Sequence, residues 1–181
     1  MKRILVPLLT PILCLLLASS VPAKSFFKIN EPAPLFTLTS VSGETVSMES
    51  LRGKVVVLGL FHICEPCLIQ GSNLQRVYEA TRGQDVAVIG VNASGDSRRA
   101  VTEFLAGFPV NVTYPYLLDP EKITDKLYGG GRFIPNVYVI GRDGIIRWQR
   151  VGNMDLAGPK AILQEVERAL ASDSAGRSTG L

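Results

Sequence analysis

Two cysteines and the only histidine of the chain stand within seven positions, in the stretch FHICEPC at residues 61–67. Such residues could bind a metal ion, form a structural disulfide, or act as two thiols that cycle between dithiol and disulfide. Cys64 and Cys67 are three positions apart, so their side chains can meet at bonding distance on the first turn of a helix. The remaining sequence has to distinguish these three kinds of site.

A metal site and a structural disulfide both have arguments against them. His62, Cys64 and Cys67 supply three ligands, whereas a structural zinc site takes four. A disulfide that closes so short a loop restricts the unfolded chain little, so it contributes little to stability. The spacing therefore favours a redox-active pair, and we expect no metal ion and no other cofactor.

The flanking pattern places the cysteines between a strand and a helix. The apolar, β-branched run at residues 55–61 predicts a strand buried on both faces, and a helix is expected from Pro66 to about Thr81. Proline suits the first turn of a helix, where its missing N–H would be unpaired anyway. The positive end of the helix should lower the pKa of Cys64 below the ordinary value of about 8.5. Cys67 lies one turn further in, so Cys64 is the expected attacking thiol and Cys67 the resolving one.

The rest of the chain alternates strand and helix patterns. Alternating apolar and polar residues around Ser42 and Gly43 predict a hairpin within residues 32–48. Further expected elements are a buried strand at 86–92, a helix from Asp96 or Ser97 to about Ala106, a short helix at 121–128, a hairpin at 136–151 and a last helix over about 156–171. This order predicts an α/β fold: a central mixed β-sheet, mostly parallel, with helices on both faces and an N-terminal β-hairpin extension.

The first 23 residues differ from the rest. A short basic start, an apolar run without charge and a small-residue ending predict a signal peptide at residues 1–23, which would also remove Cys14. The alternative is an uncleaved membrane anchor, although the run is short for a span and contains two prolines. The globular domain is expected at residues 28–172, followed by a polar, disordered tail at 173–181.

The charge balance excludes some partners. The 181 residues carry a formal net charge of +3, and Lys2 and Arg3 supply two of these charges, so 3 − 2 leaves about +1 after cleavage. This charge gives no reason to expect nucleic acid or an acidic membrane surface as a partner. Contact with a membrane is expected only through an N-terminal anchor. An exported protein also lives where disulfides persist, which agrees with a periplasmic location.

Residues 30–152 resemble the thioredoxin superfamily, and most of all its exported TlpA/ResA-like branch, which has a redoxin-like domain. The resemblance is carried by EPAPLFTLTSVSGETVSMESLRGKVVVL, CEPC, YPYLLDPEKITDKLYG and FIPNVYVIGRDG. It implies a thioredoxin-like fold in which the Ile134–Pro135 bond is cis and Pro135 faces the disulfide. A cis bond costs little before proline, and the exposed backbone edge can pair with an extended substrate segment.

The resemblance also implies a function. Members of this branch are exported thiol–disulfide oxidoreductases, so we expect a periplasmic enzyme that reduces or shuffles disulfides of exported proteins, for example in cytochrome c maturation. An upstream electron donor in the membrane would then re-reduce Cys64 and Cys67. Two positions depart from the family pattern, because Ile63 replaces a tryptophan and Gln70 replaces an acid that assists proton transfer.

Three supporting residues surround the cysteines. Pro66 shapes the helix start, and Glu65 is expected to face solvent, where its negative charge disfavours a nearby thiolate. His62 is expected to be a polar residue at the rim of the site, with the alternative that it pairs with the Cys64 thiolate and lowers its pKa. Since Ile134 is apolar and Glu65 is acidic, we expect a reductant rather than a strong oxidant.

Two other functions remain as alternatives. A peroxiredoxin-like thiol peroxidase shares the fold, but its motif places a proline and a hydroxyl residue upstream of the reactive cysteine, and VVVLGLFHIC contains neither. A zinc- or copper-binding protein of the thioredoxin fold is the second alternative.

Overall fold

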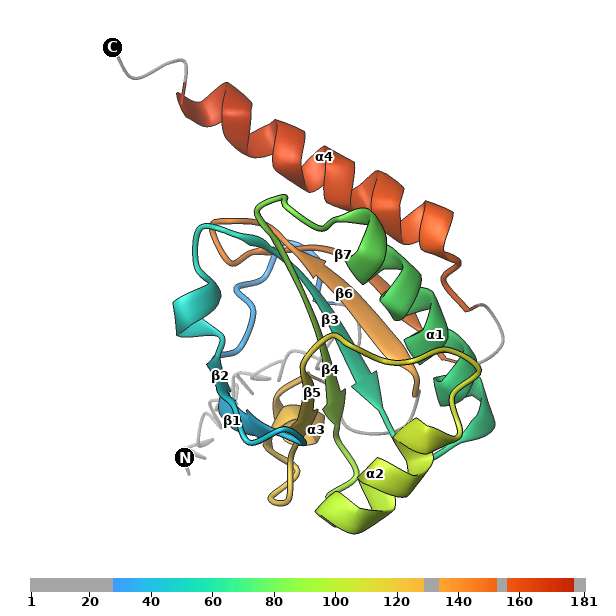
Figure 1. Ribbon diagram of the computed structural model, residues 1–181. Helices are drawn as coiled ribbons and strands as arrows, with labels where there is room; N and C mark the ends of the chain where they lie inside the picture. Colours follow the sequence, from blue (N-terminus) through green and yellow to red (C-terminus); the bar gives the residue numbers. More distant parts are fainter. Residues whose placement is uncertain (1–27, 129–133, 153–155, 178–181) are drawn as a thin grey trace, which may run out of the picture.

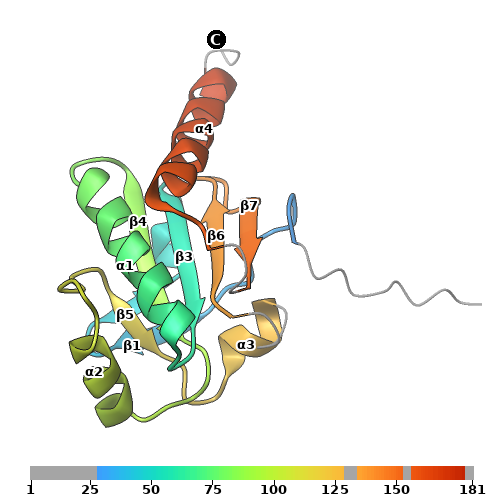
Figure 2. The same ribbon diagram turned by 90° about the vertical axis from the view of Figure 1, so that its right-hand side faces the viewer.

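The computed structural model describes residues 28–128, 134–152 and 156–177. The predicted signal peptide or anchor and the last four residues of the predicted tail lie outside these ranges. The described residues form one seven-stranded sheet in the order β2-β1-β5-β4-β3-β6-β7, drawn in Figures 1 and 2. The strands are β1 (Thr37–Ser40), β2 (Thr45–Ser47), β3 (Val55–Phe61), β4 (Val86–Asn92), β5 (Tyr116–Leu118), β6 (Asn136–Ile140) and β7 (Ile146–Val151), and the helices are η1 (Glu49–Leu51, 3₁₀), α1 (Glu65–Ala80), α2 (Arg98–Ala106), α3 (Ile123–Tyr128) and α4 (Pro159–Arg177).

The sheet is mixed, as predicted, but it is less parallel than expected. Only the pairs β3–β4 and β4–β5 are parallel, while β1–β2, β1–β5, β3–β6 and β6–β7 are antiparallel. The prediction of a mostly parallel sheet is therefore wrong. The antiparallel pairs come from the two hairpins: β1 and β2 join the sheet through β5, and β6 and β7 join it through β3.

Each face of the sheet is covered by a separate apolar layer. Helices α1 and α4 lie side by side over one face, and residues of α2 join them at its edge (Figures 1 and 2). The other face is covered by the N-terminal segment and by Tyr128 of α3. Helices on both faces and an N-terminal hairpin that extends the sheet are thus both confirmed.

A pair of glycines lets large aromatic rings lie flat on the α1 side of the sheet. Gly59 of β3 and Gly90 of β4 are direct cross-strand neighbours, and Gly90 also pairs with Tyr116 of β5. The rings of Phe61 and Tyr116 stack above this place, with centroids 6.0 Å apart and an angle of 12° between the planes. A side chain at Gly59 would collide with the Phe61 ring, so each glycine supplies the space that an aromatic neighbour fills.

Capping residues and prolines determine where helices α2 and α4 begin. Ser97 caps α2 by accepting a hydrogen bond from Ala100 N at 3.3 Å, as one of the two predicted caps. Helix α4 begins at Pro159, three residues later than predicted, because proline fixes a helical φ at a first helical position. It continues to Arg177, so residues 173–177 of the predicted disordered tail are helical, and no proline interrupts them.

No helix among the described residues has both the length and the apolar character needed to cross a membrane.

Candidate active site

The chain leaves the centre of the sheet immediately before the cysteines. Phe61 ends β3, and its carbonyl accepts a hydrogen bond of 2.8 Å from Ala93 N. Cys64 is then the N-cap of α1, with extended backbone angles of φ −154° and ψ 154°. Pro66 occupies the first turn, as predicted, so the helix starts directly after Cys64. Cys64 therefore lies at the positive end of α1 and at the carboxyl end of a central strand.

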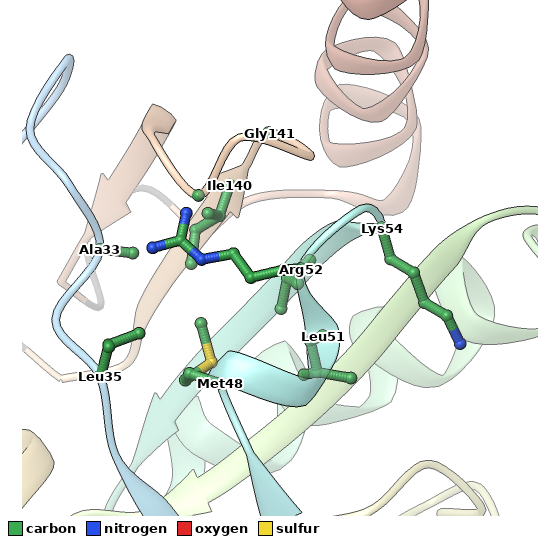
Figure 3. A pocket seen from close by; sticks show the side chains of 10 residues that line it. Ala33, Leu35, Met48, Leu51, Arg52, Lys54, Ile140 and Gly141 are labelled. Atoms are coloured by element: carbon green, nitrogen blue, oxygen red, sulfur yellow. The ribbon is translucent and has the colours of Figure 1, made fainter.

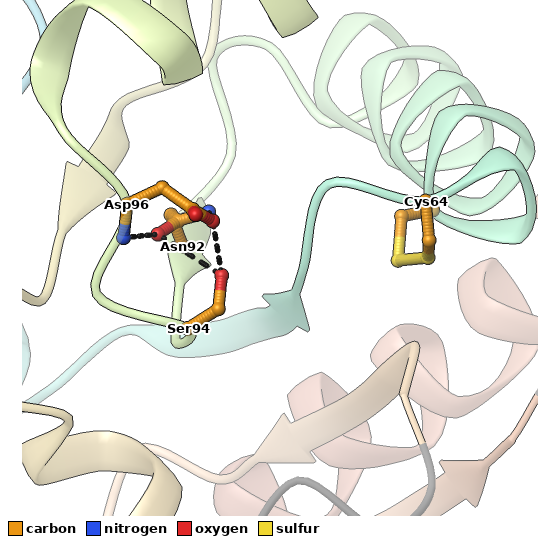
Figure 4. Close-up of a disulfide and its surroundings, with 5 residues drawn as sticks. Cys64, Asn92, Ser94 and Asp96 are labelled. Atoms are coloured by element: carbon orange, nitrogen blue, oxygen red, sulfur yellow. Dashed lines mark hydrogen bonds between the residues drawn. A yellow bond between two sulfur atoms is a disulfide. The ribbon is translucent and has the colours of Figure 1, made fainter.

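Cys64 and Cys67 form a disulfide with their Cα atoms 5.2 Å apart (Figure 4). Cys67 is fully buried, and it packs in the apolar layer beneath α1. Cys64 is partly exposed and lies at the edge of the same layer. Because an attacking sulfur must reach its target, this asymmetry supports Cys64 as the attacking thiol and Cys67 as the resolving one.

Pro135 lies at the same end of the sheet as the disulfide. Asn136, the first residue of β6, pairs with Leu60 near the end of β3, which places Pro135 beside the point where the chain leaves for Cys64. The Ile134–Pro135 peptide bond is cis, as the resemblance implied. Pro135 is buried, and its carbonyl accepts a hydrogen bond of 2.9 Å from Gly152 N. Ile134 is partly buried and contacts the apolar layers of both faces. That Ile134 and Pro135 bind substrate remains a prediction.

The surface around the cysteines is largely apolar. Ile63 and Ile69 expose 44% and 49% of their area, and Pro66 is partly exposed beside them. Glu65 is exposed, and its carboxylate makes no ion pair with another described residue. The site is therefore a disulfide within an apolar surface that carries a single acidic side chain between the cysteines.

A polar cluster that the sequence indicated only in part lies beside this end of the sheet. Asn92 Nδ2 donates to Asp96 Oδ2 at 2.9 Å, Ser94 Oγ also donates to that oxygen, and Asp96 N donates to Asn92 Oδ1 at 3.1 Å (Figure 4). Burial alone would raise the pKa of Asp96. The hydrogen bonds from Ser94 and Asn92 and the charges of His62 and Lys122 outweigh it and hold this pKa below its ordinary value. Asp96 is thus an ionised carboxylate close to the site.

The sequence contained a partial signal for this cluster. Asn92 ends a predicted buried strand that runs parallel to the strand before the cysteines, and polar residues beyond neighbouring parallel strands meet at one edge of the sheet. The sequence predicts Asp96 only as a possible helix cap, and Ser97 takes that role. The register that pairs Phe61 with Asn92 makes the connection after β4 a neighbour of His62.

Gln70 has a structural role in this fold. Its side chain is buried, with Nε2 donating to Ala157 O and Oε1 accepting from Ala157 N, both at 2.9 Å. The amide therefore fastens the segment before α4 onto α1. Both of its polar atoms are occupied, so a direct part in proton transfer is not indicated.

Neither a metal ion nor a small molecule has an evident site among the described residues. Within residues 28–128, 134–152 and 156–172, no three His, Cys, Asp or Glu side chains are grouped closely enough to hold a metal ion. A hollow at the opposite end of the sheet is lined by Ala33, Leu35, Met48 and Ile140, and the Arg52 side chain extends across it (Figure 3). Its free volume of about 10 Å³ holds no more than one water molecule.

The fold and this geometry define a class: a thioredoxin-like thiol–disulfide oxidoreductase, in which a Cys-X-X-Cys pair opens a helix beside a cis-proline. The comparison with known families agrees, because residues 29–149 match the AhpC/TSA family, and the chain belongs to it. The predicted resemblance to ResA-like proteins is confirmed by the relatives described next.

Several known proteins are similar to this chain over two thirds or more of their length. The thiol:disulfide interchange protein DsbE of Allochromatium vinosum is 30% identical over 135 residues, which cover 70% of this chain and 68% of the relative. The thiol-disulfide oxidoreductase ResA of Halalkalibacterium halodurans is 26% identical over 132 residues, covering 72% and 73%. A crystal structure of a thiol:disulfide interchange protein of the thioredoxin family from Chlorobium tepidum superposes with a TM-score of 0.59 at 26% identity, covering 77% of this chain and 95% of that one.

Proposed function

We propose that this protein is an exported thiol–disulfide oxidoreductase that reduces or shuffles the disulfides of other exported proteins through Cys64 and Cys67. The observation that carries the proposal is the disulfide between a partly exposed Cys64 at the start of α1 and a buried Cys67. A pair arranged in this way has one accessible sulfur for the substrate and one protected sulfur that resolves the intermediate.

The reaction follows from this arrangement. In the dithiol form, the Cys64 thiolate attacks one sulfur of a substrate disulfide and forms a mixed disulfide with it. The substrate S–S bond breaks, and the other substrate sulfur leaves as a thiolate and takes up a proton. The Cys67 thiol then loses its proton and attacks the Cys64 sulfur, which releases the second substrate sulfur as a thiol. Two electrons and two protons have moved to the substrate, and Cys64 and Cys67 are left as the disulfide.

The surroundings of the disulfide favour a protein as the substrate. Ile63 and Ile69 offer exposed apolar contacts on both sides of the cysteine pair. The segment at Ile134 and Pro135 lies at the same end of the sheet, where its backbone edge could pair with an extended chain.

The cellular setting is part of the proposal. Relatives are named ResA and DsbE, and the sequence begins with the features of a signal peptide or anchor. These support a periplasmic enzyme, cleaved or anchored with its domain outside the cytoplasm. An electron donor in the membrane would supply the two electrons for each cycle, and proteins of cytochrome c maturation are one class of substrate.

Free thiols provide the direct test of the reaction. The purified mature domain should gain two thiols on treatment with dithiothreitol, and C64S should lose thiol–disulfide exchange. C67S should accumulate a mixed disulfide through Cys64, and mass spectrometry of this complex would identify the trapped substrate. An unchanged thiol count, or full activity in C64S, would overturn the proposal. Rapid oxidation of Cys64 by a hydroperoxide, without exchange activity, would favour the peroxidase instead.

The proposed export has its own test. Sequencing of the N-terminus of the protein recovered from the periplasm should give Lys24 as the first residue, which follows the predicted cleavage site. A membrane-bound protein that retains Met1 would show that the segment is an anchor.

A further inference from the structure

The connection after β4 lies directly beside the segment that leads to the cysteines. Phe61 and Asn92 are paired at the ends of the parallel strands β3 and β4, and Ala93 N donates to Phe61 O at 2.8 Å. His62 follows Phe61, so it leaves the sheet next to residues 93–97. In Figure 4 the segment that leaves β3 runs between the Asn92–Ser94–Asp96 cluster and the disulfide.

Asp96 is fixed in orientation within this cluster. Its carboxylate accepts hydrogen bonds from Asn92 Nδ2 and Ser94 Oγ, while its own N–H donates to Asn92 Oδ1. Asn92 is fully buried, so the anchor of the cluster belongs to the sheet itself rather than to a surface loop. A carboxylate that accepts two such bonds, beside a backbone fixed by a third, presents a constant negative charge to its neighbours.

His62 is the basic group beside this carboxylate that lies closest in sequence to the cysteines. Its Nε2 atom is buried, and no hydrogen-bond partner for it is found in the described part of the chain. Burial raises the pKa of Asp96, whereas the hydrogen bonds from Ser94 and Asn92, and after them the charge of His62, lower it. The imidazole therefore lies in the connection next to an ionised carboxylate, and its Nε2 atom makes no hydrogen bond to another described residue.

The other charged and titratable groups around Asp96 do not replace His62. Lys122, which precedes α3, also lowers the pKa of Asp96, but its effect is smaller than that of His62. Tyr116 of β5 is neutral, since burial, followed by Tyr114 and Asp96, raises its pKa well above its ordinary value. Arg98 of α2 directs its guanidinium to the carbonyls of Ser40 and Val41.

We propose that His62 and Asp96 form a coupled pair that holds the proton exchanged with the Cys64–Cys67 dithiol. The inference rests on the proposed function, because it needs a reversible cysteine pair. His62 accepts the proton that a cysteine thiol loses before attack and returns it to the sulfur that leaves the substrate, so no net proton stays on the protein. Asp96 is a positioning residue, because it stabilises the imidazolium while the thiolate is present. The pair acts in place of an acid at the position of Gln70.

One consequence distinguishes this role from a purely structural one. If a charged imidazole stabilises the Cys64 thiolate, then by reciprocity the thiolate must strengthen proton binding by His62. Proton binding by His62 should accordingly differ between the disulfide and dithiol forms of the protein. A histidine that merely fills space at the rim would titrate alike in both.

Because the chain contains only one histidine, its imidazole resonances can be assigned without ambiguity in an NMR titration. In the disulfide form, D96N should weaken proton binding by His62 about threefold to tenfold, which moves the midpoint to lower pH, and D96E should restore most of it. The matched control is D85N, which removes the same charge at the opposite end of the sheet, where Asp85 O accepts from Val55 N. Equal midpoints of the His62 titration in wild type and D96N would overturn the proposal that His62 and Asp96 form a pair.

A second experiment measures proton binding by His62 and alkylation of Cys64 in the reduced protein. Wild-type His62 should bind its proton about threefold more tightly in the dithiol than in the disulfide form. In H62N, alkylation of Cys64 by iodoacetamide should slow about threefold to tenfold near pH 6.5 and remain unchanged near pH 9, where the thiolate forms without help. Unchanged His62 midpoints, or equal alkylation profiles, would overturn the inference while leaving the proposed function intact. Failure of the proposed function would instead appear as an absence of new thiols after dithiothreitol.

Discussion

Gln70 shows how a single side chain can hold two elements together at the edge of an active site. Its amide donates to Ala157 O and accepts from Ala157 N, while Asn73 Nδ2 makes a second bond to Ala157 O at 3.1 Å. In Q70A, Ala157 N would be left buried without its acceptor, so we expect a loss of about 2–3 kcal/mol in the free energy of unfolding, measured by urea denaturation.

The matched control for this prediction is Q164A, since Gln164 is exposed on α4 and should change stability by less than about 0.5 kcal/mol. Thiol-exchange activity per folded molecule should be unchanged in Q70A. A loss of activity at full stability would contradict the structural role and make Gln70 part of proton transfer.

At the residue scale, local sequence predicted the chemistry but not its surroundings. The positions of Cys64, Pro66 and Glu65 follow from three-residue spacing and helix-start preferences, which depend on neighbours along the chain. The environments of His62 and Asp96 depend on the pairing of β3 with β4, which joins residues more than thirty positions apart in the sequence. Single-sequence patterns do not contain that register.

At the element scale, the two central strands depend on the glycines at their middle. A Cβ atom at Gly59 would lie 2.5 Å from Phe61 Cζ and 2.7 Å from Leu74 Cδ2, and all of these atoms are buried. We expect G59A to lower the free energy of unfolding by about 2–3 kcal/mol, because the core has no room to adjust. The loss should be smaller in an F61L background, where the ring is gone, as a double-mutant cycle would show.

The control for G59A is G158A, because no atom lies within 4 Å of the added methyl group there. It should cost less than about 1 kcal/mol. Equal losses for G59A and G158A would mean that backbone flexibility, rather than the aromatic stack, decides the effect.

Long strands were easier to predict from the sequence than short ones. β3 and β4 are continuous apolar runs of seven residues, and both were predicted with their observed bounds. β5 has three residues and exists because β4 and β1 supply hydrogen bonds on its two sides. The polar composition of residues 173–177 predicts disorder, but the segment contains no proline and α4 continues through it to Arg177.

For the whole molecule, Asp96 predicts how stability responds to acid. Its pKa in the folded protein is below the ordinary value of 3.8: burial would raise it, but the Ser94 and Asn92 hydrogen bonds and the nearby positive charges outweigh that. The folded state thus favours the ionised form. This contribution is fully present above about pH 5 and is lost as the pH falls through the folded-state pKa. The difference in unfolding free energy between wild type and D96N should therefore shrink from pH 5 to pH 2, and S94A should show part of this change.

Denaturation curves at successive pH values would provide this measurement. A difference between wild type and D96N that stays constant down to pH 2 would contradict the lowered pKa of Asp96. It would also weaken the case for a permanently ionised carboxylate beside His62.

The direction of electron flow is also a property of the whole molecule, because it compares the complete dithiol and disulfide forms. The start of α1 stabilises the Cys64 thiolate, whereas the exposed Glu65 disfavours it, apolar Ile134 donates no hydrogen bond to it, and Asp96 offsets the charge of His62. A strong oxidant needs a heavily stabilised thiolate, so we expect a midpoint potential of about −270 mV rather than about −120 mV, a difference of about 10⁵ in the equilibrium constant.

A glutathione or dithiothreitol redox titration of the mature domain would measure this midpoint potential. E65Q should shift it towards the oxidising end, since one negative charge beside the thiolate is removed. A midpoint close to −120 mV, with the thiolate already formed at pH 5, would contradict the prediction and show that the charge of His62 outweighs that of Asp96 at Cys64.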